Sequence, residues 1–273
     1  GAAAAVATLL GCDRGQFMHA LATAGSFASG LQQAFRSQAM TKPMHGGHAA
    51  EAGALAAMGA AKGVTGTHDI LEGEVGFGAA MSVNPDWSKA IQDLGTDYHI
   101  TRVTFKNHGC CGHAFPSIDG VLHLKHAHGF THRDVKRIRL ATYQAGLDII
   151  DNFKPEGAYQ AKFSLPYVVA HALVHGSVRL NAFEPERLGD PEVRALMQKI
   201  ELVADPELSQ GFPRQRAARV EIETLDGRKC SHFQPTRKGD PEMPLTDEEL
   251  NDKYLELAVP VLGEAAARAL LDE

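Results

Sequence analysis

The sequence predicts an α+β protein made of an all-helical domain and an inserted α/β domain. Residues 1–100 are rich in alanine and carry apolar side chains at helical spacing. Residues 101–241 alternate strand-like and helix-like patterns, as layered α/β units do. Residues 242–273 are again helical, and we expect them to complete the first domain. A chain of 273 residues is long enough for two folding units.

The composition is typical of a globular protein and excludes some partners. Hydrophobic residues make up 44% of the chain, and the net charge of −6 comes from interspersed acidic and basic side chains. No basic stripe is present to hold a nucleic acid or an anionic membrane, and no apolar run could span a bilayer. We therefore expect neither partner, and a cytoplasmic location. The four cysteines lack the spacing of a disulfide-stapled module, so we expect reduced thiols.

The first part of the chain predicts a series of helices. Residues 1–40 are typical of two packed helices, a longer helix should run from about His48 to Lys62, and short helices should lie around Ile70 and from Asp86 to Leu94. The chain opens inside an alanine-rich helical pattern without a capping residue. We therefore expect an upstream part of this domain to be missing.

The second part of the chain predicts strands and helices in alternation. His99–Phe105 alternates apolar and polar residues like a strand, and we place the domain boundary there. Asp226-Gly227 predicts a turn, and Thr246 with Glu249 forms a capping box that starts a C-terminal helix. Between them we expect helices at Pro116–His128, Leu165–His175 and Pro191–Lys199, and strands at Val135–Thr142, Ile200–Ala204 and Ala218–Thr224.

One candidate binding segment is a glycine-flanked loop from Met40 to His48, just before the expected third helix. It carries a hydroxyl at Thr41, an ammonium at Lys42 and a histidine at His45. Free N–H groups at a helix start and the charge of Lys42 would both favour a carboxylate there. The alternative interpretation is a solvated connection with incidental histidines.

A second candidate segment runs from Lys106 to His113, where we expect a strand to lead into a helix. Lys106, His108 and His113 favour acid–base chemistry on an anionic substrate, with a cation stabilising an enolate-like intermediate. Two alternatives use Cys110 and Cys111, as metal ligands with the histidines or as a nucleophile beside His113. Adjacent cysteines seldom both reach one tetrahedral ion, and no third residue that would orient a nucleophile can be named.

Other patterns argue against metal and nucleotide cofactors. His171 and His175 are four residues apart and could share a helix face as metal ligands, but Gly176 indicates that they lie at a helix end. No phosphate-binding glycine loop and no Ser esterase elbow is present. We expect no cofactor and no metal.

Several stretches together resemble the MmgE/PrpD (2-methylcitrate dehydratase) family, which also includes cis-aconitate decarboxylase and iminodisuccinate epimerase. The stretches are Gly25–Leu31, Met40–His45, Asp69–Gly73 with Gly76-Phe77, Lys106–Asp119, Phe163–Tyr167 and Lys238–Pro241. The resemblance implies an α/β lid domain inserted into a helical domain, an active site between them, and a homodimer without metal or cofactor. The family's N-terminal part also supplies an aspartate and histidines, so we do not expect this chain alone to complete the site.

The resemblance also implies roles for individual residues. Lys42 matches the lysine of the family's Thr-Lys loop, Lys106 the lysine that opens the lid motif, and Cys111 a position held by cysteine or histidine. A histidine that many members place at the position of Phe115 is displaced here to His113. We expect catalytic roles for Lys106, Lys42, His113 and His108, and substrate binding by Thr41, His45, Ser29 and Cys111.

The expected activity is that of a cofactor-free lyase. It would remove a proton alpha to a carboxylate of a di- or tricarboxylate and then eliminate water, the commonest activity in the family. Because the same carbanion can lose carbon dioxide or be reprotonated, decarboxylation and epimerisation are alternatives. A catalytically inactive homologue and a His/Cys metal-binding protein are two further hypotheses.

Overall fold

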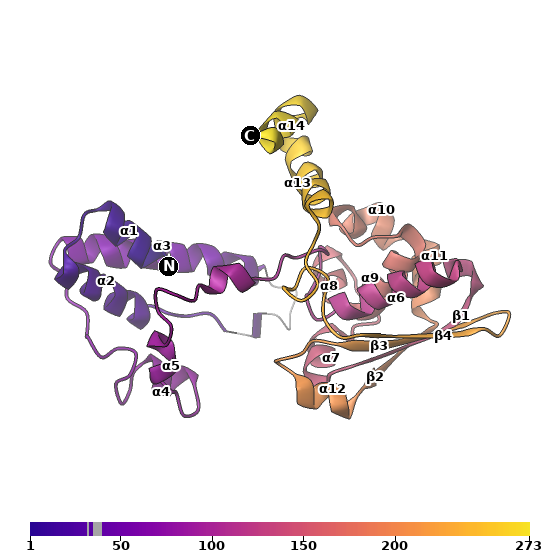
Figure 1. The fold of residues 1–273 in the computed structure, drawn as a ribbon, viewed down its shortest axis with the longest axis horizontal. Coiled ribbons are helices and arrows are strands. Elements are labelled where there is room, and N and C mark those ends of the chain that lie inside the picture. The colour runs from indigo at the N-terminus through magenta and orange to yellow at the C-terminus, as the bar shows by residue number, and fades with distance from the viewer. Residues whose placement is uncertain (32, 35–39) are drawn as a thin grey trace. The chain divides into compact units, whose positions relative to one another are not determined.

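The computed structural model describes residues 1–31, 33–34 and 40–273, which form two compact units, Gly1–Tyr98 and His99–Glu273 (Figure 1). The described part of the first unit is helical, and the second contains a four-stranded sheet with helices. The predicted α+β class is therefore confirmed. The expected assignment of residues 1–100 and 242–273 to one domain and 101–241 to another stays a prediction.

Three helices form the core of the first unit. They are α1 (Ala2–Leu9), α2 (Arg14–Ser26) and α3 (Thr41–Ala61), followed by the short helices α4 (Phe77–Met81) and α5 (Ser88–Ile91). The buried core is made of alanines, which let the helices approach closely; its members are Ala7, Ala20, Ala57 and Ala60. A β-carbon at Gly53 of α3 would lie 2.8 Å from the backbone nitrogen of Ala3, so this approach requires glycine there.

Two predictions in the first unit were wrong. The helix expected from His48 begins at Thr41, so the segment from Met40 to His48 is not a loop but the start of α3. Gly46 and Gly47 suggested a break, but helical structure continues through both, since each glycine costs only about 1 kcal/mol relative to alanine. Around Ile70 the chain forms turns instead of a helix.

The second unit is built on a mixed sheet with the strand order β2-β1-β3-β4. The strands are β1 (Val135–Thr142), β2 (Ile200–Ala204), β3 (Ala218–Thr224) and β4 (Lys229–Gln234). β1 pairs parallel to β2 and antiparallel to β3, and β3 pairs antiparallel to β4. The three predicted strands β1 to β3 are confirmed, whereas β4, which follows the Asp226-Gly227 turn, was not predicted.

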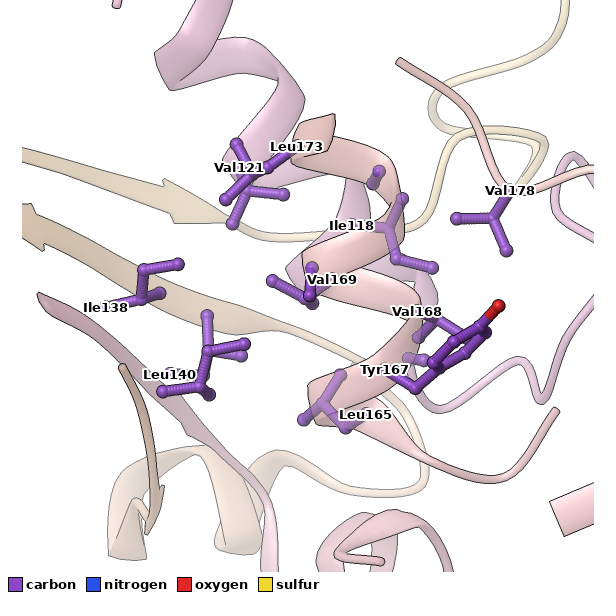
Figure 2. Close-up of a cluster of buried hydrophobic side chains, with 14 of the residues drawn as sticks. Ile118, Val121, Ile138, Leu140, Leu165, Tyr167, Val168, Val169, Leu173 and Val178 are labelled. Carbon is purple, nitrogen blue, oxygen red and sulfur yellow. The ribbon is translucent and has the colours of Figure 1, made fainter. Parts of the chain in front are cut away.

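Helices cover one face of this sheet. α6 (Phe115–His128) packs on β3 and β4, and α9 (Leu165–His175) packs on α6. Figure 2 shows Ile118 of α6 and Val169 of α9 in one apolar cluster with Ile138 and Leu140 of β1. The other face carries charged cross-strand pairs; they include Arg139–Glu221 at 3.0 Å and Arg137–Glu201. The two helices predicted here, α6 and α9, are therefore confirmed.

The strand predicted at His99–Phe105 is wrong. Residues 99–102 form a short 3-10 helix, and none of the described strands pairs with this segment. Ile100 and Val103 are 72% and 44% exposed, so the alternation has no apolar layer to contact. A two-residue period predicts a strand only where a partner strand and a core are available.

Helices complete the second unit. They are α7 (Gln144–Ile150), α8 (Ala158–Ala161), α10 (Pro185–Leu188), α11 (Pro191–Met197), α12 (Pro206–Gly211), α13 (Asp247–Leu262) and α14 (Glu264–Asp272). The predicted capping box at the start of α13 is confirmed, with Thr246 accepting from the Glu249 N–H and Glu249 from the Thr246 N–H. Throughout the described ranges, the helices are too short or too polar to cross a membrane.

Candidate active site

The candidate residues of the first unit gather near the start of α3. Thr41 and Lys42 lie exposed in its first turn, and His45 is half-buried one turn later. Gly30, next to the exposed Ser29, has φ of +129°, and a β-carbon there would lie 3.4 Å from His45 Nδ1. The small-residue stretch thus lies against the histidine, and a larger residue at position 30 would be strained and crowded.

The candidate residues of the second unit lie on the loop that leads into α6. This loop is fixed by backbone hydrogen bonds, from Gly109 N–H to Val178 O and from Cys111 N–H to Lys162 O, both 2.8 Å. Pro116 at the helix start ends the loop, because its ring suits the first helical turn. The anchored loop therefore holds the side chains between Lys106 and His113 in defined places.

Lys106 extends along the edge of this loop into solvent. Its ammonium lies 5.9 Å from the centroid of the Phe115 ring, and its carbonyl accepts a hydrogen bond of 2.5 Å from Lys253 Nζ of α13. A cavity of about 230 Å³ opens beside it, with Arg179 and Glu256 also in its wall. The cavity is rich in positive charge, which favours an anionic ligand.

His108 is buried beside a carboxylate. Its Nε2 lies 2.9 Å from Asp119 Oδ1 of α6, and the other Asp119 oxygen accepts from the Lys238 N–H at 2.8 Å. The ring also contacts the Phe115 edge. With both ends of the carboxylate occupied, this geometry fixes the loop beside Lys106 and favours a positioning role for His108.

His113 forms a hydrogen bond with Tyr143, which follows β1, with 2.7 Å between Nδ1 and the phenol oxygen. Burial, together with the charges of Arg216 and Arg237, lowers the pKa of His113 to about 4. Burial also raises the pKa of Tyr143, against the opposing effect of both arginines. Both groups are therefore neutral near pH 7, where they can donate and accept hydrogen bonds but carry no charge.

The arginine next to His113 is held by a network that joins two distant segments. Arg237 Nη2 donates to Asp240 Oδ1 at 2.6 Å and to Thr104 Oγ1 at 2.9 Å. A β-carbon at Gly112 would lie 3.2 Å from Arg237 Nη1, so the glycine leaves room for the guanidinium. Burial acts to raise the Asp240 pKa, but hydrogen bonds from Arg237 and Thr104 lower it overall. The turn at residues 238–241 therefore also orders the charges near the loop.

The two neighbouring cysteines have different surroundings. Cys110 is buried, and burial raises the pKa of its thiol, whereas Cys111 is half-buried. Within the described ranges, no group of three or more His, Cys, Asp or Glu residues is arranged to hold a metal ion. His171 Nδ1 donates to Ser177 O, and His175 Nε2 pairs with Asp190 at 2.8 Å, so both rings are used at the end of α9. The helix end predicted at Gly176 is confirmed, with φ of +84°.

Sequence reasoning missed several residues that surround the candidates. Arg179 and Lys253 share the cavity with Lys106, and Tyr143 and Arg216 adjoin His113. They come from segments far from the loop in sequence, and only the fold brings them there. Asp119 ends the Lys106–Asp119 stretch but was not predicted as a site residue; its position one helical turn beyond the loop, within reach of His108, is the signal that could have identified it.

Fold and site together define a two-part α+β protein whose second unit gathers cations and neutral acid–base groups around one anchored loop. Models of the MmgE/PrpD N-terminal domain and C-terminal domain match residues 1–90 and 108–273. The chain belongs to the MmgE/PrpD family, which confirms the resemblance seen in the sequence.

Individual relatives are enzymes by name. A cis-aconitate decarboxylase of Homo sapiens is 27% identical over 277 residues, covering 99% of this chain and 56% of that protein. A cis-aconitate decarboxylase-like protein of Aspergillus oryzae is also 27% identical, covering 96% and 57%. A mitochondrial 2-methylcitrate dehydratase of Yarrowia lipolytica is 32% identical over 104 residues, 36% of this chain and 20% of that protein. The chain spans little more than half the length of the decarboxylases that it matches.

Proposed function

We propose that this chain is part of a lyase that removes a proton alpha to a carboxylate of a di- or tricarboxylate. The observation that carries the proposal is the Lys106 ammonium at a cavity rich in positive charge, in a chain of the MmgE/PrpD family. Lys42 and Lys106 would each contact a carboxylate of the substrate. Thr41, His45, Ser29 and Cys111 would contribute further contacts.

The chemistry requires cations because a proton alpha to a carboxylate is only weakly acidic. Removing it leaves an electron pair on carbon that delocalises into the carboxylate, and a nearby ammonium stabilises that charge. In dehydration, the electron pair forms a carbon–carbon double bond as hydroxide leaves the neighbouring carbon and takes up a proton as water. His113 and Tyr143, both neutral, suit hydrogen bonding to the substrate better than storing a charge.

Decarboxylation is a second candidate, favoured by a specific observation. The human cis-aconitate decarboxylase and the decarboxylase-like protein of Aspergillus oryzae align over nearly the whole chain, whereas the dehydratase aligns over 36% of it. Loss of carbon dioxide would leave an electron pair on carbon that takes up a proton from an acid in the site. The same cations would stabilise this electron pair, so only the identity of the substrate and of the product can distinguish decarboxylation from dehydration.

Proton NMR in deuterated buffer tests the proposal on the full-length protein. Citrate, 2-methylcitrate, cis-aconitate and iminodisuccinate would be offered separately, and we expect deuterium incorporation or turnover with at least one. Lys42→Ala and Lys106→Ala should each abolish it, whereas Lys229→Ala on β4 should not. Incorporation without net turnover would indicate epimerisation. No exchange and no turnover of any of these acids by a folded full-length protein would contradict the proposal and favour an inactive homologue.

A further inference from the structure

The cavity beside Lys106 combines residues from three separate segments. Lys106 comes from the loop before α6, Arg179 from the segment after α9, and Lys253 and Glu256 from α13. Its volume of about 230 Å³ far exceeds the roughly 10–15 Å³ that one water requires. The cavity can therefore hold a ligand group larger than water.

The charges around this cavity do not balance. Three cationic side chains line it, and Glu256 is the one carboxylate among its described lining residues. Glu256 is already engaged, with one oxygen 3.7 Å from Arg179 Nε and the other accepting from the Leu180 N–H at 3.1 Å. In the part of the chain that the structure describes, neither Lys106 nor Lys253 forms an ion pair with a carboxylate.

The Lys253 side chain is held in place by its contacts. Its ammonium donates to the Lys106 carbonyl at 2.5 Å, which uses one of its three N–H groups. Burial, with the nearby charges of Arg179 and Lys106, lowers its pKa. An anion in the cavity would offset the repulsion among these three cations and would accept hydrogen bonds from the remaining N–H groups of Lys253.

A chain of interactions ties α13 to the candidate loop. Glu249 in the first turn of α13 pairs with Lys238 Nζ at 3.0 Å, and the Lys238 N–H donates to Asp119, the partner of His108. The Thr246 capping box fixes the start of the same helix. The helix that carries Lys253 is therefore connected by these contacts to the loop that carries Lys106.

We infer that Arg179 and Lys253 bind a second carboxylate of the substrate in the cavity beside Lys106, and that α13 thereby contributes to substrate specificity. The inference rests on the proposed function, because it takes Lys106 as a substrate contact. An acid with two or three carboxylates can contact Lys106 and this pair together, whereas a monocarboxylate cannot. The residues are specificity determinants and take no proton from the substrate.

Binding of unreactive acids to the full-length protein tests the inference without turnover. Tricarballylate and butyrate carry three carboxylates and one carboxylate on the same three-carbon chain, and isothermal titration would give the affinity for each. We expect Lys253→Met to weaken tricarballylate binding about tenfold to a hundredfold, the effect of one hydrogen bond to a charged group, and to lower its preference over butyrate by the same factor. Lys253→Arg should restore both, and Lys229→Met on β4 should behave like the unaltered protein.

A second variant gives a change in the opposite direction. Glu256→Gln removes the carboxylate from the cavity while its amide oxygen can still accept from Leu180 N–H, so tricarballylate should bind about two- to fivefold more tightly. This gain does not depend on whether Lys253→Met folds well.

The outcomes separate the two proposals. If Lys106→Met abolishes tricarballylate binding while Lys253→Met and Glu256→Gln leave it unchanged, the inference is overturned and the proposed function stands. If the unaltered full-length protein binds neither acid, both fail.

Discussion

The loop before α6 buries three neighbouring side chains to different degrees, and burial affects the protonation of two of them. The Cys110 thiol is buried, and burial raises its pKa, so it stays protonated and is a poor nucleophile. Cys111, the next residue, is half-buried and stays the better candidate for contact with a ligand. His113 is neutral because burial and two arginines oppose its charge. The sequence predicted that these residue types would matter, but not which of them would be charged.

The buried pair of His108 and Asp119 leads to a stability prediction. His108→Ala leaves the Asp119 carboxylate with the Lys238 N–H as its remaining hydrogen-bond donor among the described residues, and losing one partner of a buried pair costs about 3–5 kcal/mol. Urea unfolding followed by circular dichroism measures the loss. His108→Gln retains a donor and should cost clearly less. Equal losses for the two variants would mean that packing against Phe115, rather than the ion pair, fixes the loop.

A second residue-scale prediction concerns acid pH. Burial lowers the pKa of His171 to about 4, below its ordinary value of 6.5, so the unfolded chain takes up this proton first as the pH falls. The contribution of His171 is complete above pH 6.5 and declines toward pH 4, by about 2 kcal/mol at pH 5. His171→Asn keeps a donor for Ser177 O and removes the titration. Its loss of unfolding free energy between pH 7.5 and pH 5 should therefore be smaller by about that amount.

The control for this pH prediction is His126→Asn, at an exposed position near the end of α6. It should lose as much stability on acidification as the unaltered protein. An unchanged pH dependence in His171→Asn would show that other groups cause the acid loss. Direct NMR titration of the His171 ring should also give a midpoint near pH 4.

At the scale of elements, the sequence predicted those that combine periodicity with a boundary signal. β1, β2 and β3 have apolar residues on one face, α9 ends at Gly176, and α13 starts at a capping box. β4 was missed because its polar residues obscure the two-residue pattern, although Cys230 is buried. The opposite error occurred at His99–Phe105, where the pattern is present but no strand pairs with it. Whether a segment pairs with another strand depends on the fold and cannot be predicted from the local sequence.

Two glycines of α3 give a matched pair of predictions. Gly53→Ala would place a β-carbon 2.8 Å from the Ala3 nitrogen and 2.9 Å from the Ala2 β-carbon, so α1 must move away. We expect a loss of about 1–3 kcal/mol, measured by urea unfolding of the first unit through Trp87 fluorescence. Gly46→Ala meets nothing within 4 Å and should stabilise the helix by about 0.5–1 kcal/mol. Similar effects of both variants would contradict the close contact of α1 with α3.

At the scale of the whole molecule, the predicted site residues come from both units. Thr41, Lys42, His45 and Ser29 belong to the first, and Lys106, His108, Cys111 and His113 to the second. Sequence motifs could identify both groups because each is a short continuous stretch. They could not identify Arg179 or Lys253, because a single basic residue on a helix or loop has no motif and gains meaning only from the cavity that it lines.

The inferred ligand cavity brings Lys106 and Lys253 together from distant parts of the chain, and lysine cross-linking of the full-length protein tests this. The two side chains line one cavity, so a short amine-reactive cross-linker followed by mass spectrometry should join them. Tricarballylate should suppress that product, because it would occupy the space between the two ammonium groups. Lys253→Met should remove the product altogether, whereas Lys229→Met on β4 should leave it unchanged. If the product forms to the same extent with and without the acid, tricarballylate does not occupy this cavity and the inferred second carboxylate site is wrong.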